Sequence, residues 1–197
     1  MQVKLLNNPT LEFSDSAIGL CYDKGPYADP VKRDKRITKV ALKHKHSSTI
    51  EFTNFVFDIT ATTKVLLEMT RHRHANYACK STRYTLNKGD IVFEPTGDAA
   101  IDELLEGWRQ SIKSMIYQKK SNELTSLMLP QAYQYRWQVQ FNARSLMNFF
   151  DLRRSSSAHF QIRDVANAMY NVVPDDMKYL FDPVSDDETG DNNEQHD

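Results

Sequence analysis

Residues 71–84 gather three arginines, two histidines and one lysine, and they contain no carboxylate. The whole chain has a formal net charge of −1, so this positive charge is a local feature. Closely spaced cations repel one another, and a bound anion such as a phosphate group would relieve that repulsion. A solvated loop of charges is the alternative for the same pattern. The residue types therefore predict an anion-binding site, and other elements of the fold must supply its remaining walls.

The length and the hydrophobic fraction of the chain favour one domain with a hydrophobic core, since 40% of the 197 residues are hydrophobic. The end of the chain differs from the rest, because the segment from Asp182 holds seven acidic residues and no Lys or Arg. Such a composition is typical of disordered segments. We therefore expect one domain over residues 1–181, followed by a disordered acidic tail over residues 182–197.

Composition also argues against several classes of function. A net charge near zero does not favour general nucleic-acid binding. No apolar run is long enough to span a bilayer, and no signal-like stretch follows the first residues, so we expect a cytoplasmic protein without membrane partners. Cys21 and Cys79 form neither a disulfide framework nor a CxxC pair, and no glycine motif of the Rossmann or P-loop type occurs.

Hydrophobic periodicity and capping residues predict the elements that must position the basic stretch. Strands are expected over residues 2–6, 55–59, 82–86 and 135–141. Helices are expected from Ser14 or Asp15 to Tyr22, and over residues 29–43, 62–69, 98–116, 146–153 and 162–173. In the helix over 98–116 the apolar residues fall on one face. Because helices and strands interleave without regular βαβ alternation, the predicted fold class is α+β.

The spacing within the basic stretch is particular, because Arg71-His72-Arg73 is followed by seven residues and then by Ser81. This pattern resembles the Arg-His-Arg-x7-Ser motif of the flavin-dependent thymidylate synthases, the ThyX family. Three further segments resemble the same family in the same order: His46-Ser47-Ser48-Thr49-Ile50-Glu51, Asn142-Ala143-Arg144-Ser145-Leu146-Met147-Asn148-Phe149-Phe150, and Leu152-Arg153. A single short motif is fallible; four in the family's order make coincidence improbable.

The resemblance implies an enzyme that methylates dUMP reductively to dTMP. The methylene group would come from methylenetetrahydrofolate, and the hydride from FAD that NADPH has reduced. The resemblance also implies a mixed α/β fold of a single domain, with a central antiparallel-rich sheet and flanking helices. The family forms homotetramers whose active sites are shared between subunits.

The resemblance further assigns roles to individual positions. Residues expected to contact the flavin cofactor are Ser48, Glu51, Arg71, His72, Arg73, His74, Asn142, Arg144 and Asn148. Residues expected to contact dUMP are Glu68, Arg71, Lys80, Ser81, Thr82, Arg83 and Arg153. The residue types suit these roles, because guanidinium, hydroxyl and amide groups match phosphate oxygens and ring edges. A cation near a flavin also stabilises the anionic reduced ring.

Arg153 is the predicted catalytic residue. Uracil C5 is a poor nucleophile while N3 keeps its proton, and a guanidinium held against N3 and its neighbouring carbonyl favours the N3 anion. A lysine would offer a point charge in place of a planar fork. Without the family resemblance, the simpler interpretation is that Arg153 and Arg154 complement a helix C-terminus.

Four positions depart from the family pattern. Glu68 stands where a Gln is common, Cys79 where many members have Glu, and Ser126 where many have a phosphate-binding Arg; Ser157 replaces a common His. A subsidiary hypothesis makes Cys79 a nucleophile whose thiol pKa is lowered by the neighbouring arginines, although a flavin route needs no thiol adduct.

Two other functions compete with the leading one. In the first, His44-x-His46 and His72-x-His74 each lie on one strand face and bind zinc together with Glu51 or Glu68. The second is a non-catalytic flavin- or nucleotide-binding relative, which the departures at Cys79 and Ser126 favour. The leading prediction includes no metal site.

Overall fold

The computed structural model describes residues 1–182, so most of the expected acidic tail, residues 183–197, lies outside the described residues. One four-stranded sheet has the strand order β1-β2-β4-β3, and all neighbouring strands are antiparallel. The strands are β1 (Gln2–Leu5), β2 (Asn54–Thr62), β3 (Ala75–Cys79) and β4 (Gln134–Asn142). The expected α+β class with a central antiparallel sheet is confirmed.

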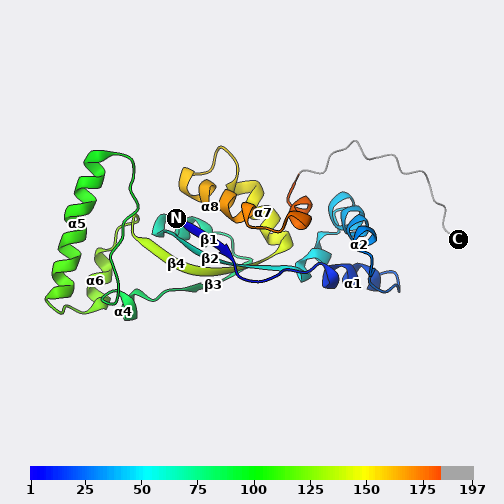
Figure 1. The fold of residues 1–197 in the computed structure, drawn as a ribbon, viewed down its shortest axis with the longest axis horizontal. Helices are drawn as coiled ribbons and strands as arrows, with labels where there is room; N and C mark the ends of the chain where they lie inside the picture. Colours follow the sequence, from blue (N-terminus) through cyan, green and yellow to red (C-terminus); the bar gives the residue numbers. More distant parts are fainter. Residues whose placement is uncertain (183–197) are drawn as a thin grey trace.

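Helices flank this sheet on one face and at both of its ends (Figure 1). The α-helices are α1 (Glu12–Leu20), α2 (Pro30–Ile37), α3 (Thr63–Met69), α4 (Thr82–Thr85), α5 (Ala99–Tyr117), α6 (Asn122–Thr125), α7 (Ala143–Arg153) and α8 (Phe160–Asn171). A π-helix, η1 (Thr38–Lys43), continues α2, and three 3-10 helices complete the described part: η2 (Ser47–Phe52), η3 (Ser126–Met128) and η4 (Asp175–Leu180). Figure 1 shows α7 and α8 over one face of the sheet, with α5 at one end of the molecule and α1 and α2 at the other.

The core lies between the sheet and the helices that cover it. Alternate residues of the two central strands point into it, as the period of two in a strand requires. They are Phe55, Phe57 and Ile59 from β2 and Trp137, Val139 and Phe141 from β4, all of them buried. Burial of each such side chain contributes about 1.5–3 kcal/mol, which fixes the register of the strands that carry the site.

Two tight turns, from β2 into α3 and from β4 into α7, explain how segments far apart in the sequence meet. Thr62 ends β2 and its Oγ1 accepts a hydrogen bond from the Val65 N–H at 3.3 Å; Asn142 ends β4 and its Oδ1 accepts from the Ser145 N–H at 2.8 Å. Such N-caps turn the chain directly into α3 and α7. Because β2 and β4 are antiparallel, with Asn54 opposite Asn142, the two helices start from opposite ends of the sheet.

The lengths of these elements bring the ends of the two helices together. The seven residues of α3 span about 10 Å and the eleven of α7 about 16 Å. The nine-residue strands beneath them are about 30 Å long. The C-terminal ends of α3 and α7 therefore meet above the middle of the sheet, where Glu68 contacts Arg153.

One expected strand was wrong. Residues 82–86 contain the short helix α4, and the strand lies earlier, as β3, inside the basic stretch. The alternation that identifies β3 is short: Ala75 and Tyr77 pack against the core, while Asn76 and Ala78 are exposed. The surrounding charges hide this weak pattern, and pairing with β4 decides the structure.

The expected start of the first helix was also wrong. α1 begins at Glu12, and Ser14 and Asp15 are buried inside it. The Ser14 hydroxyl shares a 2.7 Å hydrogen bond with Thr53, and Asp15 pairs with Arg36 at 2.6 Å. By contrast, the predicted cap of α2 is confirmed, because Asp29 Oδ1 accepts from the Val31 N–H at 3.0 Å.

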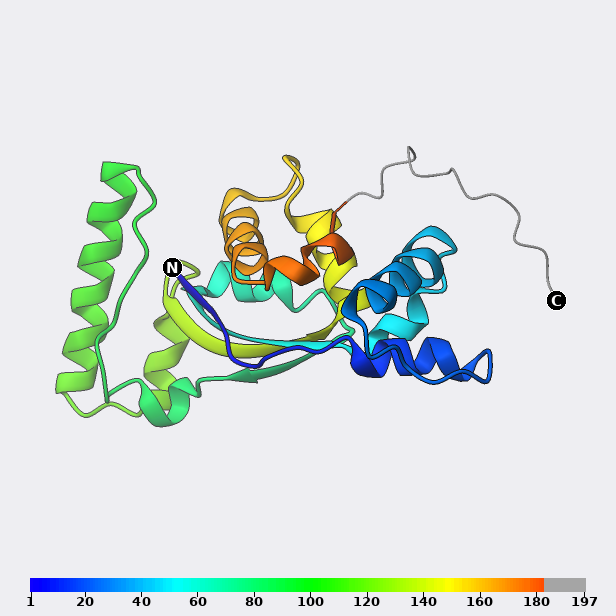
Figure 2. The ribbon, with the colours of Figure 1, turned by 45° about the vertical axis from the view of Figure 1, so that its right-hand side comes forward.

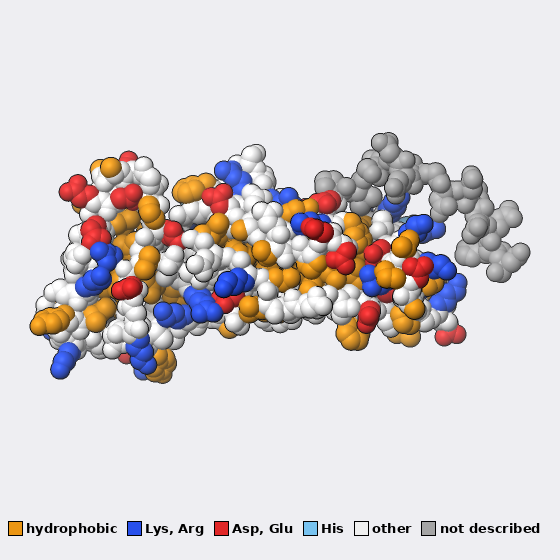
Figure 3. All heavy atoms as spheres, viewed as in Figure 1, with side chains coloured by type: hydrophobic (Ala, Val, Ile, Leu, Met, Phe, Trp, Pro, Cys, Tyr) orange, Lys and Arg blue, Asp and Glu red, His pale blue; other side chains and the backbone are white. Residues whose placement is uncertain are grey.

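The apolar face of α5 is buried only in part. Ile112 is fully buried, but Ile101, Leu104 and Trp108 expose 49%, 75% and 50% of their surface. The helix stands away from the sheet (Figure 2) and packs over a small second cluster that includes Ile91. Acidic and basic side chains are interspersed over the face that Figure 3 shows. Among residues 1–182, no helix combines the length and the apolar character needed to cross a membrane.

Candidate active site

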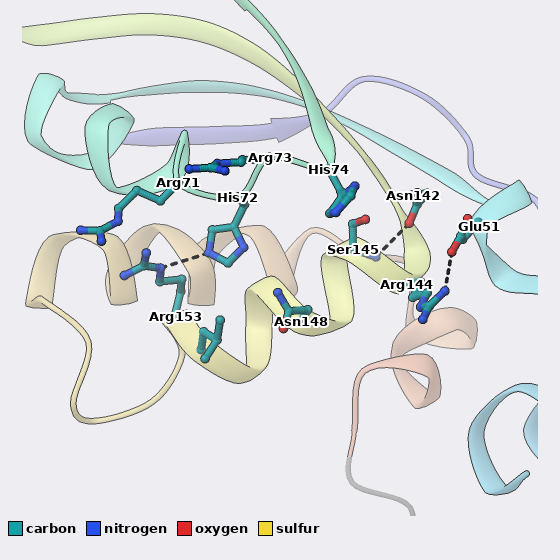
Figure 4. Close-up of a pocket in the computed structure, with 11 residues that line it drawn as sticks. Glu51, Arg71, His72, Arg73, His74, Asn142, Arg144, Ser145, Asn148 and Arg153 are labelled. Carbon is teal, nitrogen blue, oxygen red and sulfur yellow. Dashed lines mark hydrogen bonds and ion pairs between the residues drawn. The ribbon is translucent and has the colours of Figure 1, made fainter. Parts of the chain in front are cut away.

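A cavity of about 700 Å³ lies between α7 and the turn that follows α3. Its lining residues are Glu51, Arg71, His72, Arg73, His74, Asn142, Arg144, Ser145, Asn148, Leu152 and Arg153. Figure 4 shows the side chains of Arg71, His72, Arg73 and His74 on one side of it, and those of α7 on the other. Segments about 70 residues apart in the sequence thus form the two walls.

Sheet register sets the order of these walls. Ala75 is opposite Phe141, so His74 lies beside the end of β4, where Asn142 begins the turn into α7. From there residues 74 to 71 run back toward the C-terminal end of the same helix. Antiparallel pairing therefore aligns the Arg-His-Arg motif with the length of α7, and His72 comes to lie beside Arg153.

Positive charge dominates the cavity. Four arginines and two histidines line it, against one carboxylate, Glu51. That carboxylate pairs with Arg144 at 2.7 Å, and both side chains are about half exposed. Arg71 and Arg73 are exposed. A cavity of this volume with such a lining suits a large anionic ligand.

Arg153 is held by three hydrogen bonds. Its Nε–H donates to His72 Nε2, its Nη1 to Glu68 Oε2 and its Nη2 to the Glu68 carbonyl, each at 3.2 Å. Burial disfavours the charged form of Glu68, but Lys64 and the arginines outweigh it and hold the pKa of this carboxyl below its ordinary value. Burial, with the charge of Arg153, lowers the pKa of His72. The guanidinium therefore faces one anion and one neutral imidazole.

Two residues that sequence reasoning did not select hold His72 in place. The Tyr77 hydroxyl donates toward the Met69 carbonyl at 2.7 Å and the His72 carbonyl at 3.2 Å. Burial above all raises the pKa of Tyr77 to about 12, so this hydroxyl remains a donor. The Phe149 ring packs edge-on to the His72 ring, with centroids 5.0 Å apart. The strand alternation that places Tyr77 against the core was the available signal.

Most of the predicted cofactor residues lie together, and several predicted dUMP residues do not. Of the former, all except Ser48 line the cavity; Ser48 lies in η2, three residues before Glu51. Glu68 lies just outside the lining, against Arg153. Lys80, Ser81, Thr82 and Arg83 follow β3, whose five residues carry the chain about 16 Å away from the cavity.

Ser81, Thr82 and Arg83, which the family resemblance places at the phosphate of dUMP, form a separate group at the other end of β3. Thr82 and Arg83 lie in α4, which packs against α6 and is tied to it by a 3.0 Å hydrogen bond from Asn122 to the Arg83 carbonyl. Ser126 follows α6 directly. Exposed apolar side chains surround this group, among them Tyr84, Leu124 and Leu127. Within one chain, these predicted dUMP residues and the cavity are therefore apart.

A family model described as thymidylate synthase complementing protein matches residues 10–177 of the chain. A flavin-dependent thymidylate synthase of Campylobacter jejuni (strain RM1221) is 32% identical to it, over 92% of this chain and 96% of that protein. The chain belongs to the flavin-dependent thymidylate synthase family. A family member from Wolinella succinogenes is likewise 32% identical, over 92% of this chain and 97% of its own length.

A solved structure of the same family has the same fold. It is a crystal structure of ThyX from Helicobacter pylori with FAD and dUMP, and it matches with a TM-score of 0.84. The sequences are 25% identical, and the match covers 92% of this chain and 97% of that one. The predicted family and the predicted ThyX fold are confirmed.

Cys79, which departs from the family pattern, lies outside the cavity in the folded chain. The prediction that arginines lower the pKa of its thiol was wrong: although the residue as a whole is exposed, its sulfur is partly buried, and this burial raises the pKa. Cys79 lies at the end of β3, opposite Trp137, and lines a shallow hollow on the sheet with Asp58 and Arg136. It does not line the cavity that contains Arg153.

The zinc hypothesis assumed a geometry that the flavin-dependent thymidylate synthase fold does not provide. His72 and His74 precede β3, and His44 and His46 flank Lys45, which has a positive φ of 59°. Neither pair lies on a strand face. Over residues 1–182, no three His, Cys, Asp or Glu side chains come together as a metal site would require.

Proposed function

We propose that this protein is an FAD-dependent thymidylate synthase that converts dUMP to dTMP, with methylenetetrahydrofolate as carbon donor and NADPH as reductant. The observation that carries this proposal is the convergence of the Arg-His-Arg segment with α7 around one cationic cavity, in a chain of the corresponding family. Two free cysteines, both exposed, suit a reducing compartment, so we also place the enzyme in the cytoplasm.

The residues of the cavity fit FAD. Arg71, Arg73 and Arg144 offer guanidinium groups to an anionic pyrophosphate, and Asn142 and Asn148 offer amide donors and acceptors to a ring edge. Glu51 is already paired with Arg144 and so does not repel an anion with its full charge. Bound and reduced FAD supplies the hydride for the reaction.

Arg153 is the residue to which we assign the activation of dUMP. Its guanidinium lies at the end of the cavity and keeps two N–H groups, one on Nη1 and one on Nη2, without a partner among the described residues. Donation by these groups to the N3 and carbonyl edge of uracil stabilises the N3 anion. Electron density then moves toward C5, which becomes the nucleophile.

We further propose a homotetramer in which the phosphate of dUMP is bound by a neighbouring subunit. Within one chain, Ser81 and Arg83 are separated from the cavity by the length of β3. The apolar surface around them and on α5 is too exposed for a solitary chain, which supports burial against another subunit. A second copy would bring Ser81 and Arg83 to the cavity of the first.

A single assay tests the proposed function. Purified protein reconstituted with FAD should oxidise NADPH in a dUMP-dependent manner and release dTMP when methylenetetrahydrofolate is present. Flavin binding without dTMP release would instead support the non-catalytic relative. A protein that cannot be reconstituted with FAD would contradict both.

Subunit complementation tests the shared active site. Arg153→Lys and Arg83→Ala subunits, each expected to be inactive, should regain dTMP formation when they are co-expressed, because mixed oligomers contain some sites with both arginines intact. Co-expression of Arg153→Lys with Arg144→Ala is the matched control, since both residues line the cavity of the same chain and no intact site can form. Mixed oligomers without recovery in the first pair would exclude sharing.

Replacement of Cys79 should leave turnover largely intact. Burial raises the pKa of its thiol, which disfavours the thiolate, and a hydride from reduced flavin makes a thiol adduct unnecessary. The rate of dTMP formation by Cys79→Ala, compared with the unmodified enzyme, measures this. Abolished turnover with an unchanged circular dichroism spectrum would restore the nucleophile hypothesis.

A further inference from the structure

We propose that His72 is a positioning residue for Arg153 and acts as a proton-operated latch, in which unprotonated Nε2 must accept the Arg153 Nε–H. The proposal rests on the function assigned to Arg153 above. It concerns a bond between two protein side chains from opposite walls of the cavity, at 3.2 Å (Figure 4).

Geometry gives His72 control over the direction of the guanidinium. A guanidinium is planar and its donors form a rigid fork, so fixing Nε fixes the plane in which Nη1 and Nη2 lie. Glu68 accepts from both terminal nitrogens, through Oε2 and its backbone carbonyl. With Glu68 as its only partner, the guanidinium could still turn about the line that joins the two Glu68 acceptor atoms, and the bond from Nε to the imidazole removes that freedom. His72 thus orients the two N–H groups that remain for substrate.

The imidazole is itself held in a fixed orientation. Phe149 of α7 packs against its ring, and Tyr77 of β3 binds its carbonyl. The ring is half buried, so it has little freedom to turn away from Arg153. When His72 takes up a proton, its Nε2 becomes a donor, and two cations then face each other across the same contact. The hydrogen bond between Arg153 and His72 is then lost, and the latch is open.

The charged groups around this contact come from three segments. Lys64 and Glu68 belong to α3, Arg71 to the turn, and Arg153 to α7. The Lys64 ammonium lies 3.3 Å from Glu68 Oε1, whereas Arg153 contacts the other oxygen, Oε2. Glu68 is therefore engaged by two cations, and the charge that acts most directly on His72 is that of Arg153.

The sign of the pH dependence follows from these contacts. Burial and Arg153 lower the pKa of His72 below its ordinary value of about 6.5. The latch is closed above that lowered pKa and opens as the pH falls through it. We expect kcat to fall by about tenfold per pH unit below the midpoint. The Michaelis constant for dUMP should change less, because phosphate binding does not depend on this contact.

A His72→Gln variant keeps a hydrogen-bond acceptor at position 72 but removes the group that titrates. The glutamine Oε1 lies near the place of Nε2 and accepts a hydrogen bond, but it does not take up a proton in this range. We expect His72→Gln to keep measurable turnover and to lose the acid limb of the kcat profile. His74→Gln, in the same turn and cavity, is the matched control and should retain that limb. An unchanged acid limb in His72→Gln would overturn the proposal.

The contact between His72 and Arg153 can also be tested in the free protein, without substrate and independently of the proposed activity. NMR titration of the His72 ring in the free protein should show that Arg153→Gln, or Arg153→Lys if the first variant does not fold, changes the pKa of His72. If wild-type protein forms no dTMP, the proposed function fails while this titration still decides the contact. If the pKa of His72 is the same in both variants as in the unmodified protein, the proposed latch is excluded.

Discussion

Replacing Arg153 with lysine should remove nearly all dTMP formation while leaving the protein folded and able to bind flavin. Loss of one preorganised donor to a developing anion lowers kcat by about 10²–10³-fold in well-studied enzymes. Lysine retains the charge but cannot donate at once to His72, to Glu68 and to a pyrimidine edge. Steady-state kinetics of dTMP release measure the loss, and the flavin absorbance band reports an intact cofactor site.

Arg154 provides a matched control one residue away. Its guanidinium lies 3.8 Å from the centroid of the Tyr170 ring and its Nε donates to Asn167, so it faces α8 and not the cavity. Arg154→Lys should therefore leave turnover close to that of the unmodified enzyme. If both variants lose activity equally, the effect belongs to the C-terminal end of α7 as a whole and not to the Arg153 guanidinium.

Much of the cavity was predictable because the family motifs are contiguous in sequence. Once the Arg-His-Arg segment and the run from Asn142 to Arg153 were matched, their meeting followed from the family fold. The contacts that orient Arg153 could not be predicted in this way. They depend on the register of Ala75 with Phe141 and on the relative lengths of α3 and α7, which no local pattern reveals.

The predicted strands and helices were correct where hydrophobic periodicity was strong, as in β2, β4 and α8. They failed where tertiary partners decide the outcome. β3 is recognisable chiefly through its pairing with β4, and the charges around it suggested a loop. Helix α5 shows the converse case. Its periodicity correctly predicts the helix, but its apolar face stays partly exposed among the described residues.

Ser81 and Arg83 illustrate a different limit. Their proximity to the Arg-His-Arg segment in sequence suggested one continuous anion site, but a strand lies between them. Each residue of a strand advances the chain by about 3.3 Å, so the five residues of β3 separate the two parts of the motif. A motif that is continuous in sequence is thus divided between two places on the molecule, and a shared active site is the arrangement that would reunite its halves.

Removal of the Asp15 carboxylate should be among the most destabilising single changes outside the cavity. This side chain is fully buried, and Arg36, which is 12% exposed, donates to it at 2.6 Å. The backbone N–H of Tyr27 donates to the same carboxylate at 2.7 Å. Removing one partner of a buried pair leaves an uncompensated charge and costs about 3–5 kcal/mol. Chemical denaturation of Asp15→Ala, followed by circular dichroism, measures this cost.

The double variant Asp15→Leu/Arg36→Met distinguishes the ion pair from simple loss of packing. Apolar residues that replace both partners leave no buried charge, so most of the lost stability should return. Glu106→Ala breaks an exposed pair with Arg109 on α5 and should leave the denaturation midpoint unchanged. If Asp15→Ala were as stable as that surface variant, the carboxylate would not be needed to pack α1 against α2. The buried pair between Asp15 and Arg36 would then not explain how these two helices are held together.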